Sequence, residues 1–556
     1  MRYLSSIAVL ALALLPGSNA NFLLKQRAAA LRAELGLGAD GTPLESASIH
    51  RLTARDDPVV PTQYIELPID HFGKNNGTFL NRYWVNTAGY KPGGPIFVYD
   101  MGETSEEVDP DITLGPRLLN DNAVFKQLIH EFNGIGILWE HRGYGKSWNA
   151  PISNRSTPRD LQFITYENAL QDLVVFIEQF SVKGINETLT PDQRPWIHYG
   201  GSSAGVRAAM LRNKRPGTLY AAWASSAPLQ HVVDFSQYFD GVWDGLVAFG
   251  FGNCTRDIQA VVRHVDNVLE TGNEDAKAKL KAHFLGLSGA HNPDGLFAES
   301  WNSLYLDYQA QGVDGSSFSL RDFCNHLSTD PQTKQVAPKE GWVATKGIDW
   351  TLSRWTEFAP YLDQVNSFFN TSCTGNATAT DCTFNQNLYK PSDVLYLWQT
   401  CTQTGMFQSA NVGDKQLIPK ANTPENMLAQ CNLIFPDRQG ILPVRPKTDE
   451  LNRYTGGWHI YPANTFFTYG EYEPWLPLGK ASKRPDAPKN VTITTKIPEC
   501  NTLNKHLIFG SILKDQIHCY DVISRITNPV VLEARALFKQ ALRQWLTCFV
   551  PKKKQQ

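Results

Sequence analysis

Residues 196–205 read WIHYGGSSAG, a short apolar run that enters a cluster of glycine, serine and alanine. The next segment, 206–212 (VRAAMLR), has the composition of a helix. A serine on a tight turn between a strand and a helix holds its hydroxyl clear of the backbone, and its neighbours must be small because a Cβ there would clash. The stretch therefore predicts a nucleophile elbow, with Ser202 and Ser203 as the two candidate nucleophiles.

The spacing of the small residues does not decide between these two serines. The strict pattern G-x-S-x-G, from Gly201 to Gly205, is centred on Ser203. A looser pattern of small residue, x, Ser, x, small residue runs from Gly200 to Ala204 and is centred on Ser202. Both candidates stay open on the motif alone.

Strand and helix patterns alternate around the elbow. Apolar, β-prone runs at 95–99 and 135–139 predict interior strands, and residues 115–131 and 166–180 predict helices. A further strand is expected at 219–224. Such alternation is typical of a parallel sheet with helices on both faces.

Beyond about residue 232 the alternation stops and the sequence becomes aromatic, helix-prone and rich in loops until about residue 435. Strand patterns return at 464–469 and 506–509, and an amphipathic helix with Val531 and Trp545 on one side closes the chain. We therefore expect an α/β-hydrolase fold with a mostly helical inserted cap. The expected divisions are 1–20 signal peptide, 21–55 N-terminal extension or propeptide, 56–235 first part of the hydrolase domain, 236–435 cap insertion and 436–556 second part of the hydrolase domain.

The partners of the serine are expected after the two late strands, because an α/β-hydrolase carries its triad in the chain order Ser, Asp or Glu, His. Glu473 follows the first of these strands, and His518 lies just beyond the second. His506 lies on the strand itself, where a lone histidine more often fills space than catalyses. The nearest alternatives to Glu473 as the acid are Glu471, Asp515 and Asp521.

Composition limits the classes of partner. The chain has 556 residues, a net charge of −2 and 42% hydrophobic residues, which gives ample material for a core and no reason to expect nucleic acid or another polyanion. The sequence has neither a C-x-x-C nor an H-E-x-x-H motif, so no metal site is expected. No cofactor is expected either.

The first 20 residues have the charged start, apolar core and small-residue exit of a secretory signal peptide. No later stretch has the about 20 apolar residues of a membrane span. The chain is therefore expected to be secreted or delivered to a lysosome-like or vacuole-like lumen. Such a route agrees with seven N-x-S/T sequons, at Asn76, Asn154, Asn186, Asn253, Asn370, Asn376 and Asn490.

Nine cysteines, all at or after Cys254, should be mostly paired in that oxidising route, with at least one left over. Cys373 with Cys382 would close a small loop, and Cys401 with Cys431 a larger one. Neither pairing follows from the sequence.

Taken together, these residues resemble the secreted serine peptidases typified by prolyl carboxypeptidase, dipeptidyl peptidase II and the fungal acid prolyl peptidases. The resemblance covers most of residues 64–235 and 395–530. It is carried by the following motifs: Ile69-Asp70-His71-Phe72, Gly77-Thr78-Phe79, Arg82-Tyr83-Trp84, Gly93-Gly94-Pro95, Glu140-His141-Arg142, Gly200-Gly201-Ser202, Ala224-Ser225-Ser226-Ala227-Pro228, Trp398-Gln399-Thr400-Cys401, Gly470 to Trp475 and His518-Cys519.

The resemblance implies a nucleophile at Ser202, an acid at Glu473 and a base at His518. Ser203 stands where the family usually has tyrosine, and its backbone N–H becomes the expected oxyanion donor. A second donor is expected from the turn at Gly102 and Glu103. Glu473 stands where the family has aspartate, so the acid has one additional methylene.

The resemblance also implies a peptide substrate, cleaved on the carboxyl side of proline. Trp475 and Trp398 are expected to wall an apolar pocket, because a proline ring is flat, rigid and suited to stacking on indole. A secreted esterase or lipase of the same fold is the first rival and a catalytically weak binding protein the second. The sequence does not determine the oligomeric state.

Overall fold

The computed structural model describes residues 60–103, 115–315, 318–375, 381–384, 391–436 and 440–552. The expected signal peptide, the expected N-terminal extension and the sequon at Asn376 lie outside these residues. The chain divides into two compact units. The sheet unit contains residues 55–232, 394–405 and 437–556, and the helical unit contains residues 233–393 and 406–436.

The sheet unit is built on nine strands, and the sheet has the strand order of the expected α/β-hydrolase fold. The first pairings, β1 with β2 and β2 with β4, are antiparallel, and all later neighbours are parallel. In sheet order the strands are β1 (Gln63–Pro68), β2 (Thr78–Asn86), β4 (Ile135–Trp139), β3 (Ile96–Asp100), β5 (Trp196–Gly201), β6 (Ala221–Ser225), β9 (Thr465–Gly470), β11 (Leu507–Leu513) and β10 (Thr492–Thr494).

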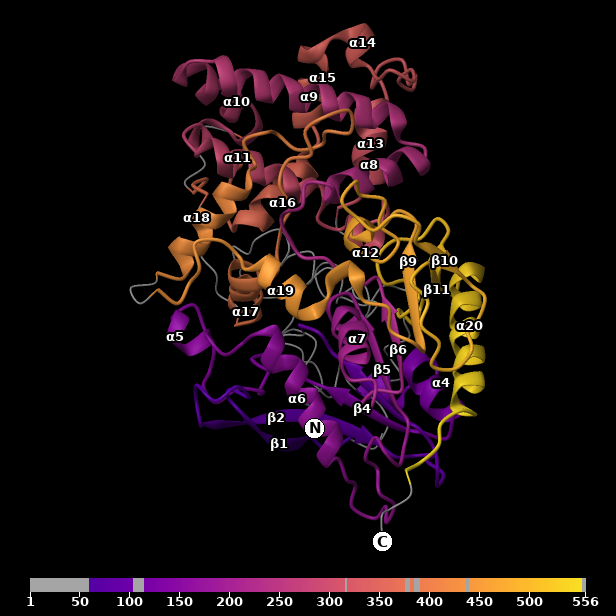
Figure 1. The fold of residues 1–556 in the computed structure, drawn as a ribbon. Helices are drawn as coiled ribbons and strands as arrows, with labels where there is room; N and C mark the ends of the chain where they lie inside the picture. Colours follow the sequence, from indigo (N-terminus) through magenta and orange to yellow (C-terminus); the bar gives the residue numbers. More distant parts are fainter. Residues whose placement is uncertain are drawn as a thin grey trace, which may run out of the picture. The chain divides into compact units, whose positions relative to one another are not determined.

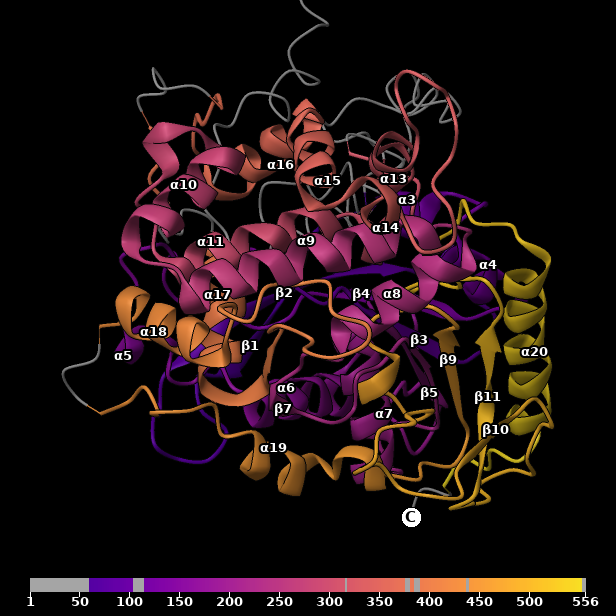
Figure 2. The ribbon, with the colours of Figure 1, turned by 90° about the horizontal axis from the view of Figure 1, so that it is seen from above.

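Helices cover both faces of this sheet, which explains why every residue of β3, β4 and β6 is buried. On one face, α3 (Gly115–Leu119), α4 (Val124–Glu131) and α20 (Pro529–Leu546) share a hydrophobic core with the strands. On the other face lie α6 (Tyr166–Gln179) and α7 (Ser203–Lys214). Two views show α20 running beside β11 (Figure 1, Figure 2). The α/β-hydrolase prediction is confirmed.

The closing helix α20 is the amphipathic segment expected from the sequence. Its residues Val531, Phe538 and Trp545 are fully buried, and Trp545 packs edge-on against Phe509 of β11 at 5.5 Å between ring centroids. The disulfide Cys500–Cys548 joins the loop before β11 to the residues just after this helix. The remaining elements of this part of the chain are α5 (Pro158–Leu161), α17 (Pro391–Gln399), the π-helical turn η5 (Thr400–Thr404), α19 (Thr448–Thr455), η6 (Gly457–His459) and η7 (Leu476–Leu478).

The helical unit has an aromatic core. Trp301 and Trp355 pack at 4.7 Å between ring centroids, and Phe284 and Phe323 contact this pair from two other helices. The helices are α8 (Tyr238–Ala248), α9 (Gly252–Thr271), α10 (Glu274–Leu285), η3 (Leu287–Gly289), α11 (Asp294–Ser300), η4 (Trp301–Tyr305), α12 (Tyr308–Gln311), α13 (Leu320–Ser328), α14 (Val343–Lys346), α15 (Ile348–Thr356), α16 (Ala359–Phe369) and α18 (Pro424–Ile434). Two short strands, β7 (Val232–Asp234) and β8 (Gly405–Phe407), form a separate small sheet.

Disulfides hold the helical unit at two places. Cys254 of α9 is bonded to Cys324 of α13, and Cys373 is bonded to Cys382, which closes the small loop considered above. Cys401 and Cys431 are also in disulfide form. Within the described ranges, no helix combines the length and apolar character needed to cross a membrane.

Candidate active site

The predicted elbow is a sharp turn between β5 and α7. β5 ends at Gly201 and α7 begins at Ser203, so Ser202 occupies the junction with φ 54° and ψ −127°. Positive φ is unfavourable for a residue with a side chain, and it persists here because both peptide groups of Ser202 are held. Its N–H donates to the carbonyl of Ser225 at 2.8 Å, and its carbonyl accepts the N–H of Val206 at 3.0 Å.

Glycine is required on both sides of this turn. A Cβ on Gly200 would lie 2.6 Å from the backbone of Ala204, and a Cβ on Gly205 would lie 2.8 Å from the carbonyl oxygen of Ser225. Real Cβ atoms do not approach backbone atoms so closely, so the strand and the helix could not meet at this angle with alanine at either position. The small residues in the motif therefore have a steric function.

Glu473 lies in the turn after β9 and is 1% exposed. Its Oε2 accepts a hydrogen bond from the N–H of Gly470 at 3.3 Å and another from the hydroxyl of Ser226. The same oxygen lies 3.5 Å from Nδ1 of His518. This separation exceeds a good hydrogen bond, a common feature of catalytic groups without bound substrate.

His518 follows β11 and is 5% exposed. Within the described residues neither ring nitrogen has a hydrogen-bond partner, so Nε2 is available to another group. Burial works to lower the pKa of His518, but the neighbouring thiol of Cys519 and the carboxylate of Glu473 outweigh it and raise the pKa above its ordinary value. The imidazole therefore has partners that favour its protonated form.

Cys519 is the free cysteine of the described chain and is half-buried. Its backbone has φ 60°, and its N–H donates to Oγ of Ser226 at 2.9 Å. A Cβ built on Gly201 would lie 3.1 Å from Sγ of Cys519. The thiol therefore packs against the residue that precedes Ser202.

The alternative acids have other partners. The carboxylate of Asp521 accepts hydrogen bonds from Trp223 at 3.0 Å, Ser225 at 2.6 Å and Thr468 at 2.5 Å. Glu471 accepts the N–H of Asp515 at 3.1 Å. These groups stabilise the strand ends and their turns.

His506 lies directly before β11, which begins at Leu507, rather than on the strand as expected. Its ring is exposed, and its Nδ1 lies 3.3 Å from the carbonyl oxygen of Asn490. Neither feature suggests a catalytic role.

The backbone N–H groups of Ser203 and Gly102, two of the three expected oxyanion donors, have different surroundings. Ser203 is the first residue of α7, where an N–H has no acceptor within the helix. Gly102 has φ 67°, and its N–H donates to Oδ1 of Asp100 at 2.8 Å, so this group is already engaged. Glu103, half-buried beside it, is the remaining candidate in that turn.

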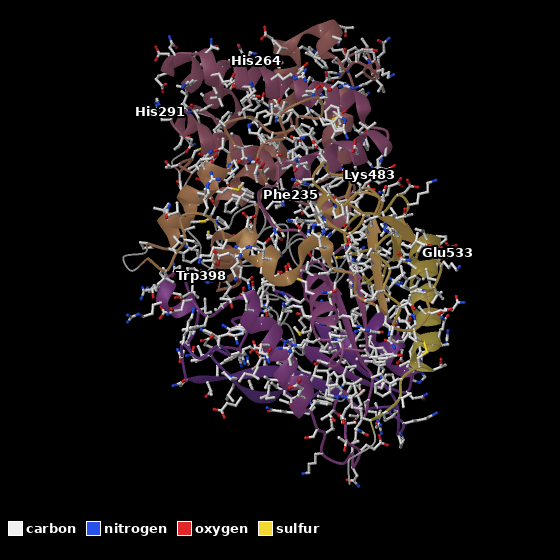
Figure 3. The ribbon with its side chains drawn as sticks, in the orientation of Figure 1. Phe235, His264, His291, Trp398, Lys483 and Glu533 are labelled. Atoms are coloured by element: carbon white, nitrogen blue, oxygen red, sulfur yellow. A yellow bond between two sulfur atoms is a disulfide. The ribbon has the colours of Figure 1, made fainter. Side chains whose placement is uncertain are left out.

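The two predicted pocket tryptophans are both buried. Trp475 is 5% exposed, and its ring centroid lies 6.5 Å from that of His518. Trp398 is 2% exposed and lies on α17 (Figure 3).

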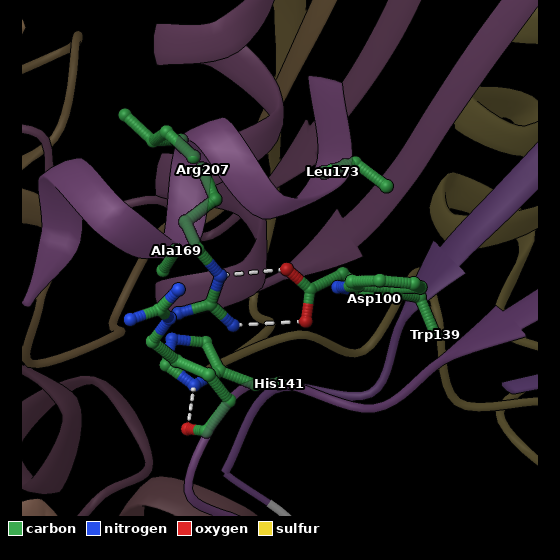
Figure 4. A pocket seen from close by; sticks show the side chains of 8 residues that line it. Asp100, Trp139, His141, Ala169, Leu173 and Arg207 are labelled. Atoms are coloured by element: carbon green, nitrogen blue, oxygen red, sulfur yellow. Dashed lines mark hydrogen bonds and ion pairs between the residues drawn. The ribbon is translucent and has the colours of Figure 1, made fainter. Parts of the chain in front are cut away.

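A buried ion pair behind the elbow was not expected from the sequence. Arg207 of α7 pairs with Asp100 at the end of β3, and both are 3% exposed (Figure 4). Beside them lies a cavity of about 10 Å³, the scale of one water molecule, which is also lined by His141. Burial, together with the charge of Arg207, lowers the pKa of His141 to about 4. In the sequence this region was signalled by the elbow and by the Glu140-His141-Arg142 motif, but neither predicts that Arg207 pairs with Asp100.

Of the described sequons, five carry exposed asparagines: Asn76, Asn154, Asn186, Asn370 and Asn490. Asn253 is half-buried at the start of α9, and its side-chain NH₂ donates to the carbonyl of Ala337 at 3.2 Å. A glycan at Asn253 would have to displace this bond. Among the described residues, no group of three or more His, Cys, Asp or Glu side chains is arranged to bind a metal ion.

The strand order and the elbow define the chain as an α/β-hydrolase. The sequence model described as serine carboxypeptidase S28 matches residues 67–497. The chain therefore belongs to the serine carboxypeptidase S28 family, which confirms the resemblance and assigns it to the serine-type peptidases.

Individual relatives are distant. A protein of Arthroderma benhamiae named as an extracellular serine carboxypeptidase is 27% identical over 79% of this chain, and the match spans 63% of that protein. Serine protease vicPa of Bipolaris victoriae is 26% identical over 83% of this chain and 86% of its own length. Among solved structures, an acetylester hydrolase of Corynebacterium glutamicum is 9% identical, with a TM-score of 0.33. The match covers 87% of this chain and 96% of the chain of that hydrolase.

Proposed function

We propose that the chain is a secreted peptidase in which Ser202 is the nucleophile, His518 the base and Glu473 the acid. The observation that carries this proposal is the pairing of Glu473 with His518, 3.5 Å apart, after β9 and β11 of the sheet whose β5 leads into Ser202. Parallel strands bring their carboxyl ends to one edge of the sheet, which is where this fold assembles its triad.

In the proposed reaction, Oγ of Ser202 attacks the carbonyl carbon of the peptide bond while Nε2 of His518 takes the hydroxyl proton. His518 then gives this proton to the leaving amine nitrogen, the C–N bond breaks, and an acyl-enzyme remains. Water attacks the ester, again losing a proton to His518, and the acid product leaves as Ser202 regains its hydrogen. Glu473 orients His518 and stabilises its cation during both halves.

The negative oxygen formed in each step needs donors that are already in position. The N–H of Ser203 is the proposed donor, supported by its place at the start of a 12-residue helix whose dipole favours negative charge. A second N–H is proposed from the turn at Gly102 and Glu103, in which the N–H of Gly102 donates to Asp100.

Labelling with a fluorophosphonate probe tests this assignment. We expect Ser202→Ala to lose the label and turnover by several orders of magnitude, whereas Ser203→Ala keeps both because its backbone N–H survives. Label that persists in Ser202→Ala and disappears in Ser203→Ala would reverse the assignment.

We further propose cleavage on the carboxyl side of proline. Support comes from Trp475, whose indole lies beside His518 and offers an apolar face to a ring that cannot donate a hydrogen bond. Trp398 is the second proposed wall. A peptide series that differs only at the residue before the cleaved bond is the test, and equal rates for proline, alanine and leucine would refute proline selection.

The second candidate function is an esterase or lipase, favoured by the strict G-x-S-x-G pattern around Ser203. Ester and peptide substrates measured side by side on the two serine variants separate it from a peptidase. A catalytically weak binding protein would react slowly with the probe and would hydrolyse neither the ester nor the peptide.

Secretion is proposed because the chain has disulfides and exposed sequons, which are typical of proteins that pass through an oxidising, glycosylating compartment.

A further inference from the structure

Ser226 lies where the three segments of the proposed triad come together. It is the first residue after β6, the strand between β5 and β9 in the sheet. Its N–H donates to the carbonyl of Thr468 in β9 at 2.7 Å, and the preceding carbonyl, that of Ser225, holds the N–H of Ser202. The side chain is 1% exposed, so water does not compete for its hydroxyl.

The hydroxyl of Ser226 joins the acid segment to the base segment. It donates to Oε2 of Glu473 and accepts the N–H of Cys519, the residue after His518, at 2.9 Å. A carboxylate oxygen can only accept and an amide N–H can only donate, so the direction of both bonds is fixed. One serine hydroxyl thus orients the carboxylate and the backbone beside the imidazole at the same time.

The backbone of Ser226 is held in an uncommon conformation to make these bonds. Its φ is 46°, in the left-handed region that residues with a side chain rarely adopt. Glycine would fit this conformation more readily. Serine at this position provides two hydrogen bonds from its hydroxyl that glycine cannot make.

A second serine of the sheet unit makes two bonds of the same kind, to a glutamate that is not part of the proposed triad. Ser147 is fully buried, donates to Oε2 of Glu140 at 2.6 Å and accepts the backbone N–H of Arg82 at 2.9 Å. The two serines have matching burial and matching partners, a glutamate and a backbone N–H. Ser147 is therefore a control for the structural cost of losing such a hydroxyl.

We propose that Ser226 is a positioning residue of the catalytic site, which keeps Glu473 directed at His518 through the hydroxyl hydrogen bonds to Glu473 and Cys519. This inference rests on the proposed function of the triad. Without the hydroxyl, the one hydrogen bond that Oε2 of Glu473 keeps among the described residues is the 3.3 Å bond from Gly470, and the N–H of Cys519 loses its acceptor. Both partners of the 3.5 Å pair then become free to turn.

The test compares Ser226→Ala, Ser226→Gly and Ser147→Ala with the unchanged protein. The concentration of active sites is measured by titrating a sample of each protein with the fluorophosphonate probe. The kcat is then calculated per active site, so misfolded protein does not lower it. We expect both Ser226 variants to lose about 10- to 100-fold in kcat with little change in KM, because misplaced catalytic groups slow the chemical step. Ser226→Gly relieves the positive φ and should still be slow, whereas Ser147→Ala should keep its kcat.

A second measurement does not require peptide cleavage. The ring C–H resonance of His518 shifts as the imidazole titrates, and the pKa read from this resonance should fall in both Ser226 variants, because Glu473 is one of the groups that raise it, and stay the same in Ser147→Ala. If the protein cleaves no peptide but this pKa follows the expected pattern, the proposed function fails and the positioning role stands. A full kcat per active site together with an unchanged pKa of His518 in Ser226→Ala would overturn the inference.

Discussion

Arg207 donates two hydrogen bonds to Asp100, from Nε to Oδ2 at 2.6 Å and from Nη2 to Oδ1 at 2.9 Å. The pair links the helix after the elbow to the end of β3, and Oδ1 also accepts the N–H of Gly102. A fully buried pair of this kind is costly to break, because the remaining charge cannot reach water.

The first prediction is that Arg207→Met lowers the free energy of unfolding by about 3–5 kcal/mol, since it leaves Asp100 buried and unpaired. Urea unfolding of the two proteins at neutral pH measures the difference. The double variant Arg207→Met with Asp100→Leu should recover part of the loss. A single variant as stable as the unchanged protein would mean that the pair contributes nothing.

This loss should also depend on pH. Burial alone would raise the pKa of Asp100, but the charge and hydrogen bonds of Arg207 hold it well below its usual range. The contribution of Asp100 is therefore complete above its unfolded pKa of about 3.9 and is lost only as the pH falls from there towards the folded value. In Arg207→Met burial is no longer opposed by Arg207 and raises the pKa of Asp100, so the charged carboxylate costs stability only above that raised pKa. The difference between the two proteins should therefore be largest at neutral pH, shrink as the pH falls through the raised pKa of the variant, and shrink further below about pH 4.

The second prediction concerns Glu473. Glu473→Gln keeps the shape of the side chain but removes the charge beside His518, so turnover should fall about 10³- to 10⁴-fold. Glu473→Asp keeps the charge and should retain far more activity. Steady-state kinetics on purified enzyme, with the active sites counted by the probe in a separate sample, provides the comparison. Near-normal turnover of the Gln variant would mean that another residue is the acid, and Asp521 would be tested next.

The third prediction uses the thiol beside His518. Cys519 is one of the groups that raise the pKa of His518 against the effect of burial. Cys519→Ala should therefore lower this pKa, so that His518 is neutral and able to accept a proton at lower pH. The acid limb of the kcat/KM profile should move to lower pH, and a limb that moves to higher pH would contradict the effect assigned to the thiol.

The fourth prediction tests the steric demand of the elbow. Gly205→Ala should cost about 1–3 kcal/mol in stability, because its Cβ would lie 2.8 Å from the carbonyl oxygen of Ser225. Fluorophosphonate labelling should slow as the turn opens. Gly217→Ala is the matched control, since nothing lies within 4 Å of a Cβ there.

Local patterns were enough to predict the elements that surround the elbow. The glycines at 200 and 205 predicted the turn, and the apolar runs at 95–99 and 135–139 form β3 and β4. These features were predictable because turn conformation and hydrophobic periodicity depend on residues that are neighbours in the sequence. The positions of Glu473 and His518 followed from the order of strands. Residues 394–405, expected within the cap insertion, lie in the sheet unit.

Long-range polar pairs could not be predicted in this way. Neither the bond from Ser226 to Glu473 nor the pair of Arg207 with Asp100 has a signature in spacing, since the partners are 247 and 107 positions apart. Such contacts depend on which strand ends become neighbours in space. The three-residue strand β10 was missed because so short a run has no periodicity.

The order of the strands has a consequence for biosynthesis. β6 is complete at residue 225, but its neighbour on one side, β9, begins at residue 465. At about 5–20 residues per second, the ribosome takes roughly 10–50 s to supply that neighbour. During this interval β6 presents an open, apolar edge, and neither Glu473 nor His518 has yet been made. With the proposed triad, a nascent chain gains proteolytic capacity only after His518 has been made, and until β9 is made the open edge of β6 can pair with other chains.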